Sequence, residues 1–231
     1  MRVFIVIPTF NEANKLRKVL SCLETQANAN IHTVVVNGAR DVETSTVVES
    51  FNGKLNVIEL QGSADKYWSG LTNVGLSHVL ANGGDEDYVI LANVDIEVGS
   101  TAVEDLVRTA RECGRAQVGA LAVYQQKIQS SGVRVRSWAL CRNDHPLAGL
   151  REQDVRWDSL IEVDFLPTRF TAIPLDHIRR NGVANERLLP HYTADYELTQ
   201  RLKRTGCRTL IYSGVRVECD MEHTGNSVYW N

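Results

Sequence analysis

Apolar and polar positions alternate along the first 125 residues in a way that predicts strands and helices in turn. Short apolar runs predict strands at 3–7, 33–36, 55–60, 88–92 and 118–124. Apolar residues three or four apart predict helices after Asn11, over 43–51, over 70–81 and after Thr101. Asn11 is expected to cap the first helix, and Thr101 with Glu104 fits a capping box on the last. This succession predicts an α/β fold with a mostly parallel central sheet flanked by helices.

The pattern changes after residue 125. Residues 125–160 are polar and irregular, which predicts a hairpin and a mobile loop. One or two strands are expected over 161–173, a helix over 195–205, and strands at 209–212 and 215–219. We therefore predict a single domain over 1–231. Its first half, 1–125, would bind a nucleotide, and its smaller, irregular half, 126–231, would select the other substrate.

Composition narrows the class of protein. The chain has 231 residues, of which 43% are hydrophobic, enough for a sizeable core. Its 25 basic and 28 acidic residues are mixed and form no basic block, which argues against a nucleic-acid partner. Five scattered cysteines without C-x-x-C spacing favour reduced thiols in the cytoplasm over disulfides or a zinc site. No apolar run has transmembrane length, so a membrane-bound substrate would be reached peripherally or through a multi-enzyme partner.

The strand expected at 88–92 ends abruptly in polar side chains. Asn93 and Asp95 follow it directly. In open α/β sheets ligands bind at the carboxyl ends of the strands, and carboxylates there can hold a hard divalent cation. The segment therefore suggests a metal–diphosphate site, although a strand followed by a plain polar turn would give the same pattern.

Five segments, in order along nearly the whole chain, resemble motifs of the family 2 glycosyltransferases and of their rhamnosyltransferase-like branch. They are FIVIPTFNE at 4–12, YWSGLTNVG at 67–75, NVD at 93–95, ADYEL at 194–198 followed by Arg201 and Gly206, and HTGNS at 223–227. The resemblance implies the GT-A fold. Two departures stand out: the second strand ends in Asn37 where the family usually has Asp, and Ala194 replaces the acidic neighbour of Asp195.

The resemblance also implies roles for individual residues. Those expected to bind the nucleotide sugar are Pro8, Thr9, Asn11, Glu12, Asn37, Asp65, Asn73 and Asn93. Those expected to bind the acceptor are Trp68, Arg169, His191, Tyr192 and Glu197. Asp95 and His223 would bind Mn²⁺ or Mg²⁺, and Asp195 would be the general base.

Several of these residues also have a simpler structural interpretation. Pro8 could only end a strand, Trp68 could belong to the core, and Asp195 could only cap a helix. Either Asn37 or Asp65 could replace the missing second-strand Asp. Trp138 and Trp157 are expected to pack rather than bind. A carboxylate at a helix N-terminus is stabilised as the anion, so Asp195 is expected to be ready to accept a proton.

The expected activity is a metal-assisted, inverting transfer of a sugar from a UDP- or dTDP-linked donor to a hydroxyl of a glycan or glycolipid. A sugar-nucleotide nucleotidyltransferase is disfavoured, because such enzymes usually carry a Gly-rich loop after the first strand. A non-catalytic module that binds nucleotide sugars or glycans stays open, since it would keep the donor site without needing Asp195.

Overall fold

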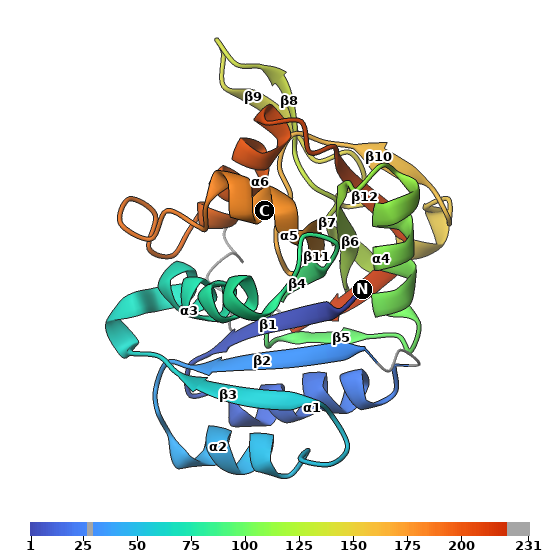
Figure 1. Ribbon diagram of the computed structural model, residues 1–231. Coiled ribbons are helices and arrows are strands. Elements are labelled where there is room, and N and C mark those ends of the chain that lie inside the picture. The colour runs from blue at the N-terminus through green and yellow to red at the C-terminus, as the bar shows by residue number, and fades with distance from the viewer. Residues whose placement is uncertain (27–29, 221–231) are drawn as a thin grey trace.

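The computed structural model describes residues 1–26 and 30–220, and its centre is one mixed sheet (Figure 1). The strands along the sheet run in the order β10-β12-β6-β11-β4-β1-β2-β3. Their bounds are β1 Val3–Thr9, β2 Ile31–Asn37, β3 Val57–Gln61, β4 Tyr88–Ala92, β6 Gln117–Tyr124, β10 Leu160–Glu162, β11 Phe170–Pro174 and β12 Thr209–Cys219. Two short strands extend it: β5 (Ile96–Val98) pairs with β12, and β7 (Lys127–Ser130) pairs with β6. A separate two-stranded sheet is formed by β8 (Arg134–Ser137) and β9 (Arg142–Asp144).

Helices cover both faces of the sheet. Side chains of α1 (Ala13–Glu24), α2 (Val42–Glu49) and α4 (Ala102–Glu112) belong to the hydrophobic core on one face. Those of α3 (Tyr67–Asn82), α5 (Leu175–Asn181) and α6 (Ala194–Arg204) belong to the core on the other. Short 3₁₀ turns lie at Ala64–Lys66 and Glu152–Asp154. In the described ranges no helix combines the length and the apolarity needed to cross a bilayer.

The predicted α/β fold is confirmed, and the first half follows the predicted order closely. Strands β4, β1, β2 and β3 pair in parallel, as expected for βαβ units. The second half departs from the prediction, because β11 runs antiparallel to both of its neighbours. The two late strands are one continuous strand, β12, with a register shift between Tyr212 and Arg216. Strand β5 and helix α5 were not predicted.

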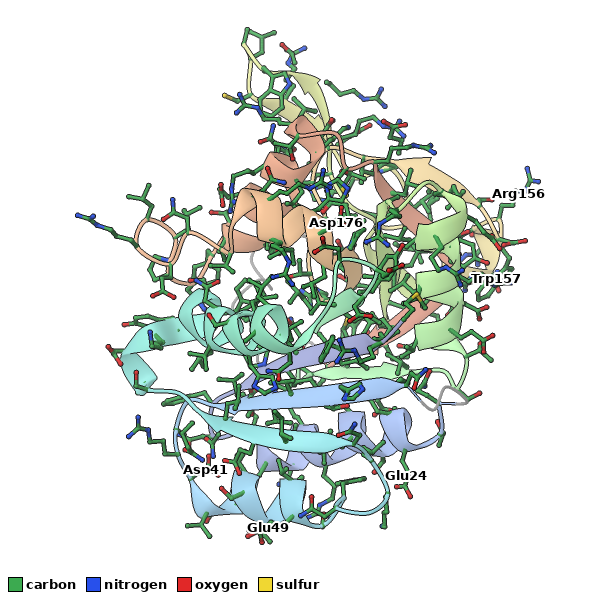
Figure 2. The ribbon with its side chains drawn as sticks, in the orientation of Figure 1. Glu24, Asp41, Glu49, Arg156, Trp157 and Asp176 are labelled. Atoms are coloured by element: carbon green, nitrogen blue, oxygen red, sulfur yellow. The ribbon has the colours of Figure 1, made fainter. Side chains whose placement is uncertain are left out.

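Two predicted helix caps are wrong. Asn11 has a φ of 56°, and α1 begins after Glu12 instead. Thr101 precedes α4 but makes no capping hydrogen bond through its side chain. A cap does form on α2, where the Thr44 amide donates to Asp41 Oδ1 at 2.7 Å. Asp41 lies at the start of this helix (Figure 2).

Helix α3 lies unusually close to the sheet at Gly75. A Cβ added there would stand 2.4 Å from Cγ1 of Val6 and 3.2 Å from Cγ2 of Val36. Both valines are fully buried, so neither can move away without disturbing the strands beneath. Glycine at this position therefore sets the spacing between α3 and strands β1 and β2.

We expect Gly75→Ala to destabilise the protein even though alanine is the better helix former. Overpacking a core costs about 1–3 kcal/mol, which exceeds the gain of about 1 kcal/mol from helix propensity. Urea unfolding would measure the loss. Gly99→Ala is the matched control, because an added Cβ there meets nothing within 4 Å. Equal stability of the two variants would contradict this account of α3 packing.

Candidate active site

Several of the predicted donor residues lie at the carboxyl ends of the parallel strands. Thr9 and Asn37 are register partners at the ends of β1 and β2, and the Gly38 amide donates to the Thr9 carbonyl at 2.9 Å. Pro8 lies inside β1 and does not end it. The Thr9 hydroxyl is buried and has no hydrogen-bond partner in the described structure, so it is available to a ligand.

The turn after β1 presents both an aromatic ring and charge. Phe10, which the motif analysis did not single out, is 46% exposed, and its ring lies beside Gly38. Asn11 follows in a left-handed conformation, and Glu12 forms an ion pair with Lys15 at 2.9 Å. The exposed ring of Phe10 offers a flat surface at the strand ends. An aromatic residue in the first strand–helix turn was the available sequence signal for it.

Asn37 is buried, and its side chain is engaged within the protein. Its Nδ2 donates to Glu59 Oε1 at 2.9 Å and to the Asp41 carbonyl at 3.1 Å, while its Oδ1 accepts from the Arg40 amide at 2.8 Å. Both donor hydrogens are therefore used in ordering the turn between β2 and α2. Of the two candidates for the missing second-strand Asp, Asp65 is the exposed one. A hydrogen bond with Ser63 holds the pKa of Asp65 below its usual value.

The start of α3 is tied to the loop that precedes α6. Asn73 Nδ2 donates to the Ala184 carbonyl at 2.8 Å and to Glu186 Oε2 at 2.9 Å, while its buried Oδ1 has no partner among the described residues. The Ser69 hydroxyl donates to the Pro190 carbonyl at 2.6 Å. These bonds bring Trp68, which is half-buried, into the same region as the loop residues that follow Pro190.

Two of the predicted acceptor residues lie in that loop and are exposed. The ring of His191 lies 4.4 Å from that of Tyr192 and 6.3 Å from that of Tyr67, measured between centroids. Glu197, one turn into α6, is paired with Arg201, whose Nε donates to Glu197 Oε1 at 2.7 Å. The structure thus gives Glu197 a stabilising partner, whereas His191 and Tyr192 are open to a ligand.

Asp95 lies beyond the end of β4 with one carboxylate oxygen unpaired. Its Oδ1 is buried without a hydrogen-bond partner among the described residues. Asp220 is held next to it by a bond of 2.9 Å from its own amide to the Asp95 carbonyl. A pocket of about 180 Å³ is lined by these residues together with Lys15, Lys18, Val94, Ile96, Glu97, Glu218 and Cys219.

This arrangement fits the divalent cation that the fold family implies. A buried carboxylate oxygen lacking a partner is a suitable ligand for a hard cation, and a second carboxylate is nearby. Within residues 1–26 and 30–220, no three His, Cys, Asp or Glu side chains gather closely enough to hold a metal on their own. The other predicted ligand, His223, lies outside the described residues, as does the whole segment 223–227.

Arg169 connects the end of β4 to α6. Its carbonyl accepts from the Asn93 amide at 2.9 Å. Burial raises the pKa of both Asp195 and Cys219, and the positive charge of Arg169 offsets part of each rise. Nη1 of its guanidinium is buried and has no hydrogen-bond partner in the part of the chain that the structure describes. A buried donor of this kind is costly unless it is matched by an acceptor, which favours an anionic ligand at this point.

Asp195 is the second residue of α6 and points back into the site. Its Oδ1 accepts from the Tyr196 amide at 2.9 Å, and its Oδ2 accepts from the Thr168 amide at 3.3 Å. Burial nevertheless raises the pKa of Asp195, and the two amides and Arg169 offset only part of that effect. The amides of the helix N-terminus stabilise the anion as expected, but burial has the larger effect on the pKa of this carboxyl. Burial also raises the pKa of Tyr196 to about 12.

Comparisons with known proteins bear on the family and on the fold. The sequence profile described as Glycosyl transferase family 2 matches residues 4–162, a range that contains Asp95 but not Arg169 or Asp195. A comparison with curated proteins found no match. Many solved structures are similar, and three of them, all below 20% identity, align with at least 94% of this chain.

The similar structures include S. aureus TarS 1-349 in complex with UDP-GlcNAc, with a TM-score of 0.70 and 15% identity over 100% of this chain and 62% of that one. The crystal structure of S. aureus TarS has a TM-score of 0.68 and 16% identity, and the match covers 94% of this chain and 36% of that one. The structure of GalNAc-T7 with UDP, GalNAc and Mn²⁺ has a TM-score of 0.74 and 14% identity, and the match covers 95% of this chain and 44% of that one. The likeness confirms the predicted GT-A fold, while this chain spans less than two thirds of the length of each of these proteins.

The raised pKa of Asp195 predicts a pH-dependent effect of Asp195→Asn on stability. Below about pH 4 the carboxyl is protonated in both the folded and the unfolded chain and contributes nothing. As the pH rises, the unfolded chain ionises first, so the wild type loses stability up to the folded-state pKa. We therefore expect Asp195→Asn to have the higher Tm at pH 7, with the difference shrinking toward pH 4. Thermal melts across this range measure it, and a difference independent of pH would contradict the assignment.

Proposed function

The chain belongs to glycosyl transferase family 2, and we propose on that basis that it is an inverting glycosyltransferase. It would move a sugar from a UDP- or dTDP-linked donor to a hydroxyl of a glycan or glycolipid acceptor. The observation that carries the proposal is the position of Arg169. Its buried, unpartnered guanidinium nitrogen belongs to a residue bonded to Asn93 on one side and electrostatically coupled to Asp195 on the other.

The donor would lie across the carboxyl ends of β1, β2 and β4. The unpartnered Thr9 hydroxyl and the exposed ring of Phe10 suit the nucleoside, with Asp65 as a further polar partner. The diphosphate would reach toward Asp95 and the guanidinium of Arg169, where a buried cation can neutralise the charge of the leaving group. Gly38 and Gly62 both lie against Leu71 of α3, so a side chain at either position would collide with Leu71 beside the strand ends.

Asp95, with Asp220 and the predicted ligand His223, would hold Mn²⁺ or Mg²⁺. A divalent cation bound there would supply Lewis-acid stabilisation of the departing diphosphate. This assignment is supported by the unpaired Oδ1 of Asp95 and by the acidic residues around the adjoining pocket.

Asp195 would act as the general base. It would take the proton from the acceptor hydroxyl while the hydroxyl oxygen forms a bond to the anomeric carbon. The bond from that carbon to the diphosphate oxygen would break on the opposite face, and its electron pair would leave with the nucleoside diphosphate. Burial raises the pKa of the Asp195 carboxyl in the direction of neutral pH. A general base is most effective when its pKa lies near the pH at which the enzyme works.

Two nucleotide sugars are the first candidate donors to test. UDP-GlcNAc is one, since it occupies the similar TarS structure, and dTDP-rhamnose is another, since several motifs resemble the rhamnosyltransferase-like branch. We place the reaction in the cytoplasm, where the five free thiols would stay reduced.

We expect Asp195→Asn to lower turnover by about 10²–10⁴-fold while nucleotide binding is retained, because the amide cannot accept the proton. Release of UDP or dTDP in the presence of an acceptor extract measures the reaction. Glu104→Gln is the matched control, since Glu104 is an exposed carboxylate in the first turn of the remote helix α4. Full turnover by a folded Asp195→Asn would refute the assignment of the base.

We expect UDP or dTDP to raise the Tm of the wild type only when Mn²⁺ or Mg²⁺ is present, because a ligand that binds the native state alone stabilises it. Asp95→Asn should abolish this metal-dependent part of the shift, and Glu104→Gln should retain it. Thermal melts with each nucleotide, with metal or EDTA, provide the measurement. An equal shift in EDTA would remove the metal from the proposal while leaving the transferase itself open.

A further inference from the structure

The hairpin formed by β8 and β9 extends away from the body of the protein. Figure 1 shows it projecting beyond α6 at the top of the molecule, and its two strands pair with each other and not with the described strands of the central sheet. Its tip, residues 138–141, has the sequence Trp-Ala-Leu-Cys, and all four residues are exposed. Trp138 is 64% exposed and Leu140 is 65% exposed, so the prediction that Trp138 serves mainly for packing is wrong for most of its surface.

The strands beneath this apolar tip are positively charged. Within residues 134–144, Arg134, Arg136 and Arg142 outnumber the one acidic residue, Asp144, so the hairpin itself is basic in a chain whose net charge is −3. Arg136 is paired with Asp144, its Nε donating to Oδ2 at 2.9 Å. Arg142 is exposed and has no partner in the described structure. Arg134 makes a long bond of 3.4 Å to the Glu162 carbonyl, and its charge helps to lower the pKa of Asp164.

The hairpin is anchored at its base rather than loosely attached. The Val135 amide donates to Asp164 Oδ2 at 2.7 Å, and Lys203 of α6 donates to Asp164 Oδ1 at 2.7 Å. Although burial opposes it, bonding to Lys203 holds the pKa of Asp164 below its usual value. At the other end, the Trp138 ring meets Phe165 edge-on with centroids 5.9 Å apart. A segment held in this way can present its tip in a fixed direction.

We propose that this hairpin docks the protein on an anionic membrane surface. Trp138 and Leu140 enter the interface between headgroups and acyl chains, where tryptophan is favoured, and the arginines beside them contact lipid phosphates. A free anion would use the arginines but not the apolar tip, whereas an anionic bilayer matches both within one short segment. The proposal goes beyond the transferase activity and does not depend on it.

The test is flotation of the full chain with vesicles of phosphatidylcholine alone or with 30% phosphatidylglycerol. We expect binding to the anionic vesicles only, weakened by salt because the arginine contacts are screened. The double variant Leu140→Ser/Arg142→Gln should bind at least about tenfold more weakly, since each basic residue near an anionic surface and each inserted side chain adds to the affinity. Both residues are exposed, so its melting curve should match that of the wild type.

The matched control is Arg187→Gln/Leu188→Ser, which makes the same chemical changes at another exposed site; Leu188 is 74% exposed. This control should bind like the wild type. The proposal is overturned if the wild type does not float with anionic vesicles, if neutral vesicles bind it equally, or if the hairpin variant and the control behave alike. None of these results bears on turnover, so the transferase proposal is tested separately.

Discussion

The site depends on the insertion of β11 between β4 and β6. Strand β11 pairs with β4 along Tyr88–Ala92 on one side and with Val118 and Gly119 of β6 on the other. Without β11, strands β4 and β6 would have no common neighbour in the sheet. The same pairing brings Arg169 to Asn93 and places Thr168 where its amide reaches Asp195. One antiparallel strand thus completes the sheet and joins the region around Asn93 to the region around Asp195.

Three polar groups in the centre of the site are not fully stabilised by the described residues around them. Within residues 1–26 and 30–220, a buried nitrogen of Arg169 and a buried oxygen of Asp95 have no hydrogen-bond partner. Burial also opposes the ionisation of the Asp195 carboxyl. Each of these costs stability in the folded protein, because buried polar groups are normally paired. Substrates that bring a diphosphate, a cation and a hydroxyl would satisfy all three, which is a physical reason for the protein to retain the cost.

The order of elements in the first half could be predicted because apolar periodicity reports directly on βα alternation, and β4 was located to the residue. The position of β11 could not be predicted, since its antiparallel pairing depends on partners remote in sequence. Asn37 was identified as unusual, yet only the structure shows that Glu59 and Asp41 engage its amide. For Asp195, the helix-terminus rule indicated a stable anion, but desolvation dominates, and burial of a single carboxyl is not visible in sequence.

Strand β6 has a consequence for how the chain is made. It is almost wholly apolar and buried, and its long-range neighbours in the sheet are β11 and β12, both encoded far downstream. During synthesis on the ribosome, therefore, most backbone hydrogen-bonding groups of β6 stay unpaired until those later strands have left the exit tunnel. An apolar strand in that state is a site for misassociation with other nascent chains. Slowed translation or chaperone binding between residues 125 and 209 would protect the protein during that interval.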